Sequence, residues 1–390
     1  MRLSRRVSGL QASLTRRLFD LAQRYDDVVD LTLGDPDLFP PSSLRRAACE
    51  AIRRGRTRYS QNAGLMAARK AVAEFNTGFY GKKISPEEVI LTCGGMEALY
   101  LTLAALVDTG DEVIIPAPYW VNYGHMTMLC GGKPVFVPTR PEDDFAISVE
   151  ELERAITKRT RVLILNSPNN PTGRMIPGRA LDEIARMAVR HDLFVISDEV
   201  YRSLVYDGAR HESIWTRPGM RRRCVIIDSM SKRFSMTGYR LGMAIAPKEL
   251  VLVLSRLQEN VAACAPLPSQ YAAIAGYDLK TDASHLLREF AKRRRVLLDG
   301  LAGIHGLSIG AVDGTFYAFV NISATGLNSY DFATRLLERQ HVAVVPGRTY
   351  GRQYDDYVRI AFTVSVARIK IALTRISCFL EQCRRKGGRR

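Results

Sequence analysis

Short, strongly apolar runs recur along the chain, and most lead through a glycine-, proline- or hydroxyl-rich turn into a helical pattern. The runs are the ranges 89–92, 112–115, 162–165, 193–196, 224–227 and 243–246. Strands that are apolar on both faces are typical of a parallel sheet covered by helices on both sides. The pattern therefore predicts an α/β fold in which ligands bind beyond the carboxyl ends of the strands.

The pattern changes after residue 256. The segment from Gln270 to Leu301 reads as mostly helical and predicts a link between two domains. Apolar runs at 314–320, 342–347 and 357–362 then predict further short strands. Near the other end, residues 30–33 predict a short strand that ends in a Gly/Asp/Pro turn.

Composition restricts the class of protein. The chain has 390 residues, of which 46% are hydrophobic and 25% charged, as in ordinary globular proteins. No apolar run approaches the ~18 residues of a membrane-spanning helix. The seven cysteines lie far apart without a CxxC pair, so we expect reduced thiols in a cytoplasm.

Both ends of the chain are basic. Leucines and a valine spaced by three and four residues between Leu3 and Leu21 predict an amphipathic segment rather than a secretory signal. The net charge is +16, and the tail 384–390 is rich in arginine. Such a tail could touch nucleic acid or an anionic membrane. Because no nucleic-acid module accompanies it, we expect a solvated tail and neither kind of partner.

The run at 224–227 leads into Asp228-Ser229-Met230-Ser231-Lys232, and Arg240 follows eight residues after the lysine. A lysine that is desolvated near a second cation has a lowered pKa and can form an imine with an aldehyde. Hydroxyls and an arginine close by suit a phosphate. The alternative is a surface Lys–Arg pair, and this stretch alone favours neither reading.

Other strand ends carry polar or aromatic residues. Gly94 and Gly95 open a helix, whose free N–H groups suit a phosphate, although a glycine pair is a weak signal. Trp120 could stack on a planar ring or fill the core. Asn170, Asp198 and Tyr201 also follow strands. Because the carboxyl ends of parallel strands lie at one edge of the sheet, we expect these residues to lie close together. This favours one shared site over a separate structural explanation for each residue.

Two more residues have a local alternative. Arg359 lies within the predicted strand 357–362, where it could point outward by alternation or clamp a carboxylate. Gly34 lies in the turn after residue 33, where its backbone could approach a ligand or simply form the turn.

Taken together, these motifs resemble the class I/II aminotransferases of the fold-type I pyridoxal-phosphate family, nearest to the bacterial aspartate/prephenate branch. The resemblance covers about residues 3–380 and rests on long ordered motifs. These are Leu33 to Asp37, Asn166 to Gly173, Ser197 to Tyr201, Ser231-Lys232 with Thr237 to Arg240, and Tyr357 to Ile360.

The resemblance implies a large domain built on a mostly parallel seven-stranded sheet and a smaller α+β C-terminal domain. We expect an N-terminal segment at 1–40 that packs with the small domain, a large domain at 41–280 and a small domain at 281–390. The resemblance also implies an enzyme that moves an amino group from an L-amino acid to a 2-oxo acid by a ping-pong mechanism. We expect a homodimer with shared active sites, located in the cytoplasm.

The resemblance also implies roles for individual residues. Lys232 would form the Schiff base with pyridoxal 5'-phosphate and act as the base in the proton shift. Asp198 would pair with the pyridine nitrogen, while Tyr201 and Asn170 would hydrogen-bond the ring oxygen. The further cofactor-binding residues would be Gly94, Gly95, Met96, Trp120, Ser229, Arg240 and Tyr59, the last from the neighbouring subunit. The substrate would be held by Gly34, Trp120, Asn170 and Arg359. No metal is implied.

One position departs from the aspartate-type pattern. In that branch a lysine follows the glycine pair and contacts the side-chain carboxylate of the substrate, whereas this chain has Met96. An apolar side chain cannot pair with a carboxylate. We therefore expect a neutral aromatic or aliphatic amino donor rather than strict aspartate specificity.

Two other functions are compatible with some of these residues. A lyase, oxidase or cyclase of a biosynthetic pathway could use the same residues, because these reactions share a carbanion intermediate. A transcription regulator could carry the same fold beside a DNA-binding domain. The sequence leaves no obvious room for such a domain before the fold, so we expect an enzyme.

Overall fold

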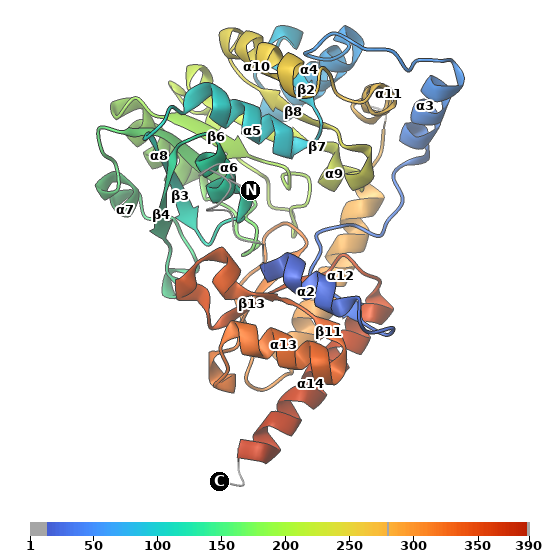
Figure 1. Cartoon of the computed structure of the whole chain (residues 1–390), viewed down its shortest axis with the longest axis vertical. Helices are drawn as coiled ribbons and strands as arrows, with labels where there is room; N and C mark the ends of the chain where they lie inside the picture. Colours follow the sequence, from blue (N-terminus) through green and yellow to red (C-terminus); the bar gives the residue numbers. More distant parts are fainter. Residues whose placement is uncertain (1–13, 279–280, 388–390) are drawn as a thin grey trace, which may run out of the picture.

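A mostly parallel sheet forms the centre of the larger body of the molecule (Figure 1). The computed structural model describes residues 14–278 and 281–387. Among them, seven strands make this sheet, in the order β2 (Val89–Thr92), β8 (Gly242–Ile245), β7 (Cys224–Ser229), β6 (Phe194–Asp198), β5 (Thr160–Asn166), β3 (Glu112–Ala117) and β4 (Lys133–Pro138). Only β8 runs antiparallel to its neighbours. The α/β fold predicted from the apolar runs is confirmed.

The two faces of the sheet bury alternate residues of its central strands. In β5, Leu163 and Leu165 join one hydrophobic core, whereas Val162 and Ile164 join another on the opposite face. Helices cover both faces, which explains why the strands are apolar throughout. These helices are α3 (Ser42–Arg53), α4 (Met66–Tyr80), α5 (Gly95–Leu106), α6 (Asn122–Leu129), α7 (Val149–Arg154), α8 (Gly178–Arg190), α10 (Lys248–Val261) and α11 (Leu267–Gly276).

A smaller body lies below the larger one, and the long helix α12 (Ser284–Ala302) runs between them (Figure 1). Its described sheet has the order β12 (Val345–Pro346), β13 (Tyr357–Ala361), β10 (Tyr317–Asn321) and β9 (Ser308–Ile309). Helices α13 (Ser329–Gln340) and α14 (Val366–Gly387) pack with it. Its own core includes Phe316, Phe332 and Phe379.

The N-terminal part of the chain joins this smaller body. Helix α2 (Leu14–Ala22) contributes Leu18 to the small-body core, and strand β1 (Val29–Asp30) pairs in parallel with β11 (Val342–Ala343). Residues 1–13 of the expected amphipathic segment, and 388–390 of the basic tail, lie outside the described residues. The chain then crosses to the larger body through α3.

Some element boundaries differ from the sequence prediction. Residues 342–347 are not one strand: β11 pairs with β1, whereas β12 pairs with β13, because the chain turns between two sheets. Strand β4 was missed, since an edge strand has one neighbour and its residues 133–136 are not fully buried.

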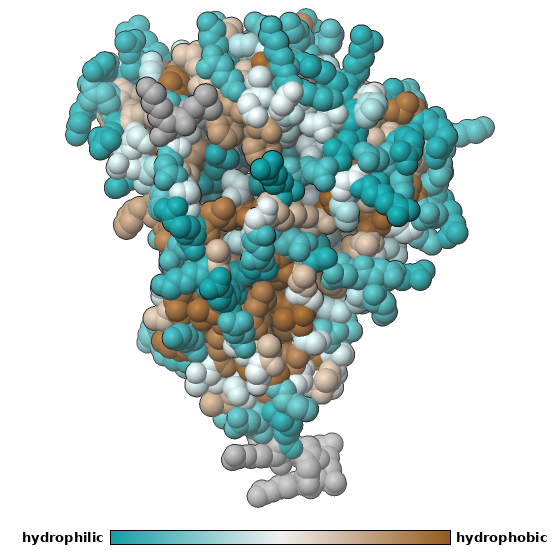
Figure 2. Space-filling model, turned by 180° about the vertical axis from the view of Figure 1, so that it is seen from behind, coloured by the Kyte–Doolittle hydropathy of each residue, from teal (hydrophilic) through white to brown (hydrophobic). Residues whose placement is uncertain are grey.

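The surface is mostly hydrophilic. Seen from behind, hydrophilic residues cover most of the upper body, and apolar residues gather on the lower body (Figure 2). None of the described helices is long and apolar enough to cross a membrane.

Candidate active site

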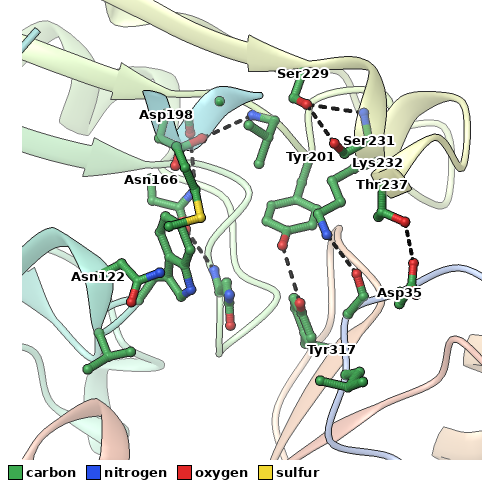
Figure 3. Close-up of a pocket in the computed structure, with 18 of the residues that line it drawn as sticks. Asp35, Asn122, Asn166, Asp198, Tyr201, Ser229, Ser231, Lys232, Thr237 and Tyr317 are labelled. Carbon is green, nitrogen blue, oxygen red and sulfur yellow. Dashed lines mark hydrogen bonds between the residues drawn. The ribbon is translucent and has the colours of Figure 1, made fainter. Parts of the chain in front are cut away.

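A cavity of about 570 Å³ lies at the carboxyl ends of the parallel strands and reaches the smaller body (Figure 3). Its walls come from segments that are far apart in the sequence, as expected at the ligand-binding edge of such a sheet. The predicted residues that line it are Gly34, Gly95, Met96, Trp120, Asn170, Asp198, Tyr201, Ser229, Lys232, Arg240 and Arg359.

Lys232 projects into the cavity from the short helix α9 (Met230–Arg233), which begins where β7 ends. The hydroxyl of Ser229 accepts a hydrogen bond from the Ser231 backbone N–H at 3.1 Å and caps this turn. The Lys232 amine donates to the Gly34 carbonyl at 2.6 Å. Burial lowers the pKa of Lys232, which favours a neutral, nucleophilic amine. Lys232 is half-buried and lines the cavity, so the surface-pair alternative does not describe it, although Arg240 is exposed.

Asp198 is the last residue of β6 and is 5% exposed. Its carboxylate accepts hydrogen bonds from the Tyr123 hydroxyl at 2.6 Å and from the Val200 backbone N–H at 3.3 Å. Burial raises the pKa of Asp198 to about 6, and the Tyr123 bond acts in the opposite direction. A buried carboxylate without a full countercharge is suited to a cationic N–H group on a ligand.

Asn166, at the end of β5, ties the neighbouring strand ends together. Its amide donates to the Asp198 carbonyl at 3.0 Å, and its side-chain oxygen accepts from the Asn170 backbone N–H at 2.8 Å. These bonds fix the loop after β5 relative to β6 and bring Asn170 to the cavity wall.

Arg359 enters the cavity from β13 in the smaller body and is 5% exposed. Its Nη1 donates to the Asn170 side-chain oxygen at 3.0 Å, and its Nη2 donates to the Thr32 carbonyl. The guanidinium lies 4.2 Å from the centre of the Tyr317 ring. The outward-pointing alternative is wrong, and the fixed guanidinium is available to hold a carboxylate.

Gly95, Ser229 and Arg240 line another part of the cavity, and Gly94 lies next to Arg240. Gly94 precedes α5 with a φ of +87°, and a Cβ there would lie 2.5 Å from Arg240 Nη2. Arg240 itself donates from Nη1 to the Thr237 carbonyl at 2.8 Å. Backbone N–H groups at a helix start, a hydroxyl and a guanidinium together form an anion site suited to phosphate.

The comparisons with known proteins agree with this geometry. Residues 26–376 match the family model "Aminotransferase class I and II". The chain belongs to this family. It is 38% identical to aromatic-amino-acid aminotransferase 2 of Thermococcus litoralis, over 98% of this chain and 99% of that one. It is 36% identical to a probable aspartate/prephenate aminotransferase of Thermus aquaticus, over 97% and 99%.

Solved structures give the same result. The aspartate aminotransferase of Thermus thermophilus with maleate superposes with a TM-score of 0.91 at 35% identity, over 97% of this chain and 100% of that one. The chain is thus an aminotransferase of fold type I that transfers amino groups between amino acids and 2-oxo acids. The lyase, oxidase and cyclase alternative is not favoured.

Aminotransferases of this family use pyridoxal phosphate, and the residues present fit that group. The cavity offers a half-buried amine for its aldehyde, a buried carboxylate for its ring nitrogen and an anion site for its phosphate. Gly94 has a φ of +87°, a backbone conformation that residues with a Cβ rarely adopt, so this turn at the phosphate side favours glycine.

Two predicted cofactor residues do not line the cavity of their own chain. Gly94 is not among the residues that line the cavity, and Tyr59 is 86% exposed on the surface of the larger body. The prediction for Tyr59 places it in the active site of a neighbouring subunit, and it stays a prediction.

The sequence reasoning missed several tyrosines of the site. Tyr123 donates to Asp198, Tyr317 lies under Arg359 with its hydroxyl 3.3 Å from that of Tyr201, and Tyr350 also lines the cavity. Tyr123 follows Trp120 by three residues, and its backbone N–H donates to the Trp120 carbonyl at 3.0 Å, so its nearness to that predicted residue was a usable signal. Nothing in the local sequence distinguished Tyr317 or Tyr350 from core aromatics.

Proposed function

We propose that this aminotransferase uses pyridoxal 5'-phosphate held on Lys232. The observation that carries the proposal is a half-buried lysine amine with a lowered pKa in the same cavity as a buried carboxylate and a buried arginine. Bound pyridoxal phosphate supplies the aldehyde that takes up the amino group and a ring that accepts electrons from the substrate Cα.

The proposed roles of the protein residues follow from their surroundings. Asp198 keeps a proton on the ring nitrogen, and Tyr123 supports Asp198 in its ionised form by donating to it. Tyr201 and Asn170 hydrogen-bond the ring oxygen, and Trp120 covers the ring. Gly94, Gly95, Met96, Ser229 and Arg240 form the phosphate end.

We further propose that Arg359 binds the α-carboxylate of each substrate, together with the backbone of Gly34. This contact fixes the orientation of Cα relative to Lys232 in both half-reactions. Lys232, whose pKa is lowered by burial, then moves the proton to and from Cα as a general acid–base.

The amino donor is proposed to be a neutral aromatic or aliphatic L-amino acid. Met96 is 41% exposed and lines the cavity at the position where aspartate-type enzymes are expected to carry a lysine. The relatives named above include both aromatic and aspartate aminotransferases, so membership of the family is compatible with either kind of amino donor. Rates with phenylalanine and aspartate, each with 2-oxoglutarate, test this; a strong preference for aspartate would refute it.

The central test is the visible absorbance band of the purified protein. We expect wild-type protein to carry the band and to lose it on addition of a true amino donor. Lys232→Ala should lack the band of the lysine-bound cofactor, whereas Lys248→Ala, which removes an exposed lysine, should keep it. A normal band in Lys232→Ala would refute the assignment.

We propose a homodimer with shared active sites. Tyr59 is far more exposed than a core aromatic, and a partner subunit would provide the active site in which it could bind the cofactor. Mixing Tyr59→Ala with Lys232→Ala subunits tests it. A mixed dimer contains one site with both Lys232 and the partner-derived tyrosine, so activity should reappear. If the mixture stays as inactive as the separate variants, the shared site is refuted.

The remaining proposals concern organisation and location. We propose a small domain at 281–390 joined by the segment 1–40 and a large domain at 41–280, supported by the pairing of β1 with β11. A cytoplasmic location is supported by the free cysteines in the described part of the chain.

A further inference from the structure

The hydroxyl of Tyr350 is a buried polar group without an evident role. The side chain is 1% exposed, and it borders the cavity of the candidate active site. Among residues 14–278 and 281–387, nothing forms a hydrogen bond with this hydroxyl. Buried hydroxyls nearly always have a partner, because an unmade hydrogen bond away from water is costly.

A second unpartnered donor lies beside it. The Arg359 guanidinium is 5.4 Å from the centre of the Tyr350 ring and 4.2 Å from that of Tyr317, so the two rings flank it. Arg359 uses Nη1 and Nη2 for Asn170 and Thr32, whereas its buried Nε–H has no partner in the part of the chain that the structure describes. The Tyr350 ring and the Arg359 guanidinium thus lie near each other at the cavity wall, and each residue carries one buried donor without a partner among the described residues.

Packing explains the ring of Tyr350 but not its hydroxyl. The ring packs edge-on against Phe319, with the ring centres 5.9 Å apart, and phenylalanine would serve equally there. Tyr354 shows the usual arrangement in the same cluster. Its hydroxyl donates to the Ala117 carbonyl at 2.6 Å and accepts from the Thr139 backbone N–H at 3.2 Å. It does not line the active-site cavity.

We propose that the Tyr350 hydroxyl donates a hydrogen bond to the substrate α-carboxylate that Arg359 holds. This inference rests on the proposed function, and it adds a binding residue that the sequence did not suggest. A carboxylate is an acceptor-only group with room for several donors. Because every amino donor and every 2-oxo acid acceptor carries this carboxylate, the contact serves both half-reactions and is independent of the substrate side chain.

Tyr350→Phe is the direct test, because it removes the hydroxyl and keeps the ring. A hydrogen bond to a charged group corresponds to a roughly 10- to 100-fold change in binding. KM should therefore rise by about that factor for the donor and for 2-oxoglutarate, with a smaller change in kcat. The increase should be similar for phenylalanine, leucine and glutamine as donors. Thermal stability should not fall, since no hydrogen bond within the protein is lost.

Tyr354→Phe is the matched control. It should lower thermal stability, because it removes the bonds to Ala117 and Thr139, and it should leave KM within about twofold of wild type. The inference is overturned if Tyr350→Phe leaves KM unchanged, if KM rises only for donors with a polar side chain, or if stability falls while KM stays constant.

A binding measurement separates failure of this inference from failure of the proposed function. The probe is 3-phenylpropionate, a carboxylate that lacks the amino group, titrated calorimetrically into wild-type and Tyr350→Phe holoenzyme. If wild-type protein transaminates no amino acid, the proposed function fails. Weaker binding of the probe by the variant still supports the tyrosine contact, and equal binding refutes it.

Discussion

Asp198→Asn should make the cofactor-free protein more stable, although it should abolish efficient catalysis. In the structure, burial raises the pKa of Asp198 to about 6, whereas an unfolded aspartate titrates near 3.9. A carboxyl group whose pKa is raised by folding binds its proton more tightly in the native state. Stability is therefore lost as the pH rises from about 4 to about 6, and the loss stays constant above that.

The size of the effect follows from this difference. Above pH 7 the ionised carboxylate costs the folded protein about 3 kcal/mol, and at pH 5 it costs roughly half as much. Asparagine has nearly the same shape and no charge. It can accept from the Val200 N–H and pair with the Tyr123 hydroxyl, so most of this cost should disappear.

Urea unfolding at pH 5 and pH 8 measures the difference in the free energy of unfolding between cofactor-free wild-type and Asp198→Asn protein. We expect the variant to be more stable by about 2–3 kcal/mol at pH 8 and by about half of that at pH 5. Asp35→Asn, which changes an exposed carboxylate of the same cavity, is the control and should have little effect at either pH.

Excess pyridoxal phosphate should reverse the order at pH 8, since only the carboxylate pairs with a protonated ring nitrogen. A variant that is less stable than wild type at pH 8 without the cofactor, or a gain that does not depend on pH, would refute the argument that burial opposes the ionisation of Asp198.

Three other substitutions test the site. Tyr123→Phe removes the donor to Asp198 and should raise the pKa of that carboxyl. The affinity for pyridoxal phosphate should therefore fall about tenfold, and more at pH 6 than at pH 8. An affinity equal to that of wild type at pH 6 would contradict this role. Gly34→Ala places a Cβ 1.8 Å from the Tyr317 hydroxyl, so KM should rise at least about tenfold while circular dichroism shows a folded protein. An unchanged KM would contradict the close approach of Gly34 to Tyr317. Met96→Lys should raise kcat/KM for aspartate relative to phenylalanine by about fivefold, as expected for a half-exposed ion pair, and an unchanged ratio would show that Met96 does not face the substrate side chain.

Local sequence was sufficient wherever a residue's role depends on its place in an element. Strands buried on both faces must be apolar throughout, so runs such as 162–165 and 224–227 marked the parallel sheet directly. Residues just after those strands lie at one edge of the sheet. The closeness of Asn170, Asp198 and Lys232 could therefore be predicted from the sequence.

Tertiary structure was needed wherever a role depends on contacts between distant segments. The element boundaries near 342–347 were mistaken because a change of sheet leaves no mark in an apolar run. Tyr123 became part of the site through a contact with Asp198, which is 75 residues away in the chain.

The chemistry of this protein was thus determined by its sequence, because the lysine, the acid and the phosphate-binding glycines occupy fixed positions relative to strand ends. The substrate site was decided by the fold. Arg359 and Tyr350 come from the smaller body, and only the packing of that body against the sheet edge brings these two residues to the cavity of Lys232. Distances between bodies are set by many weak contacts along the whole chain, and no short motif encodes them.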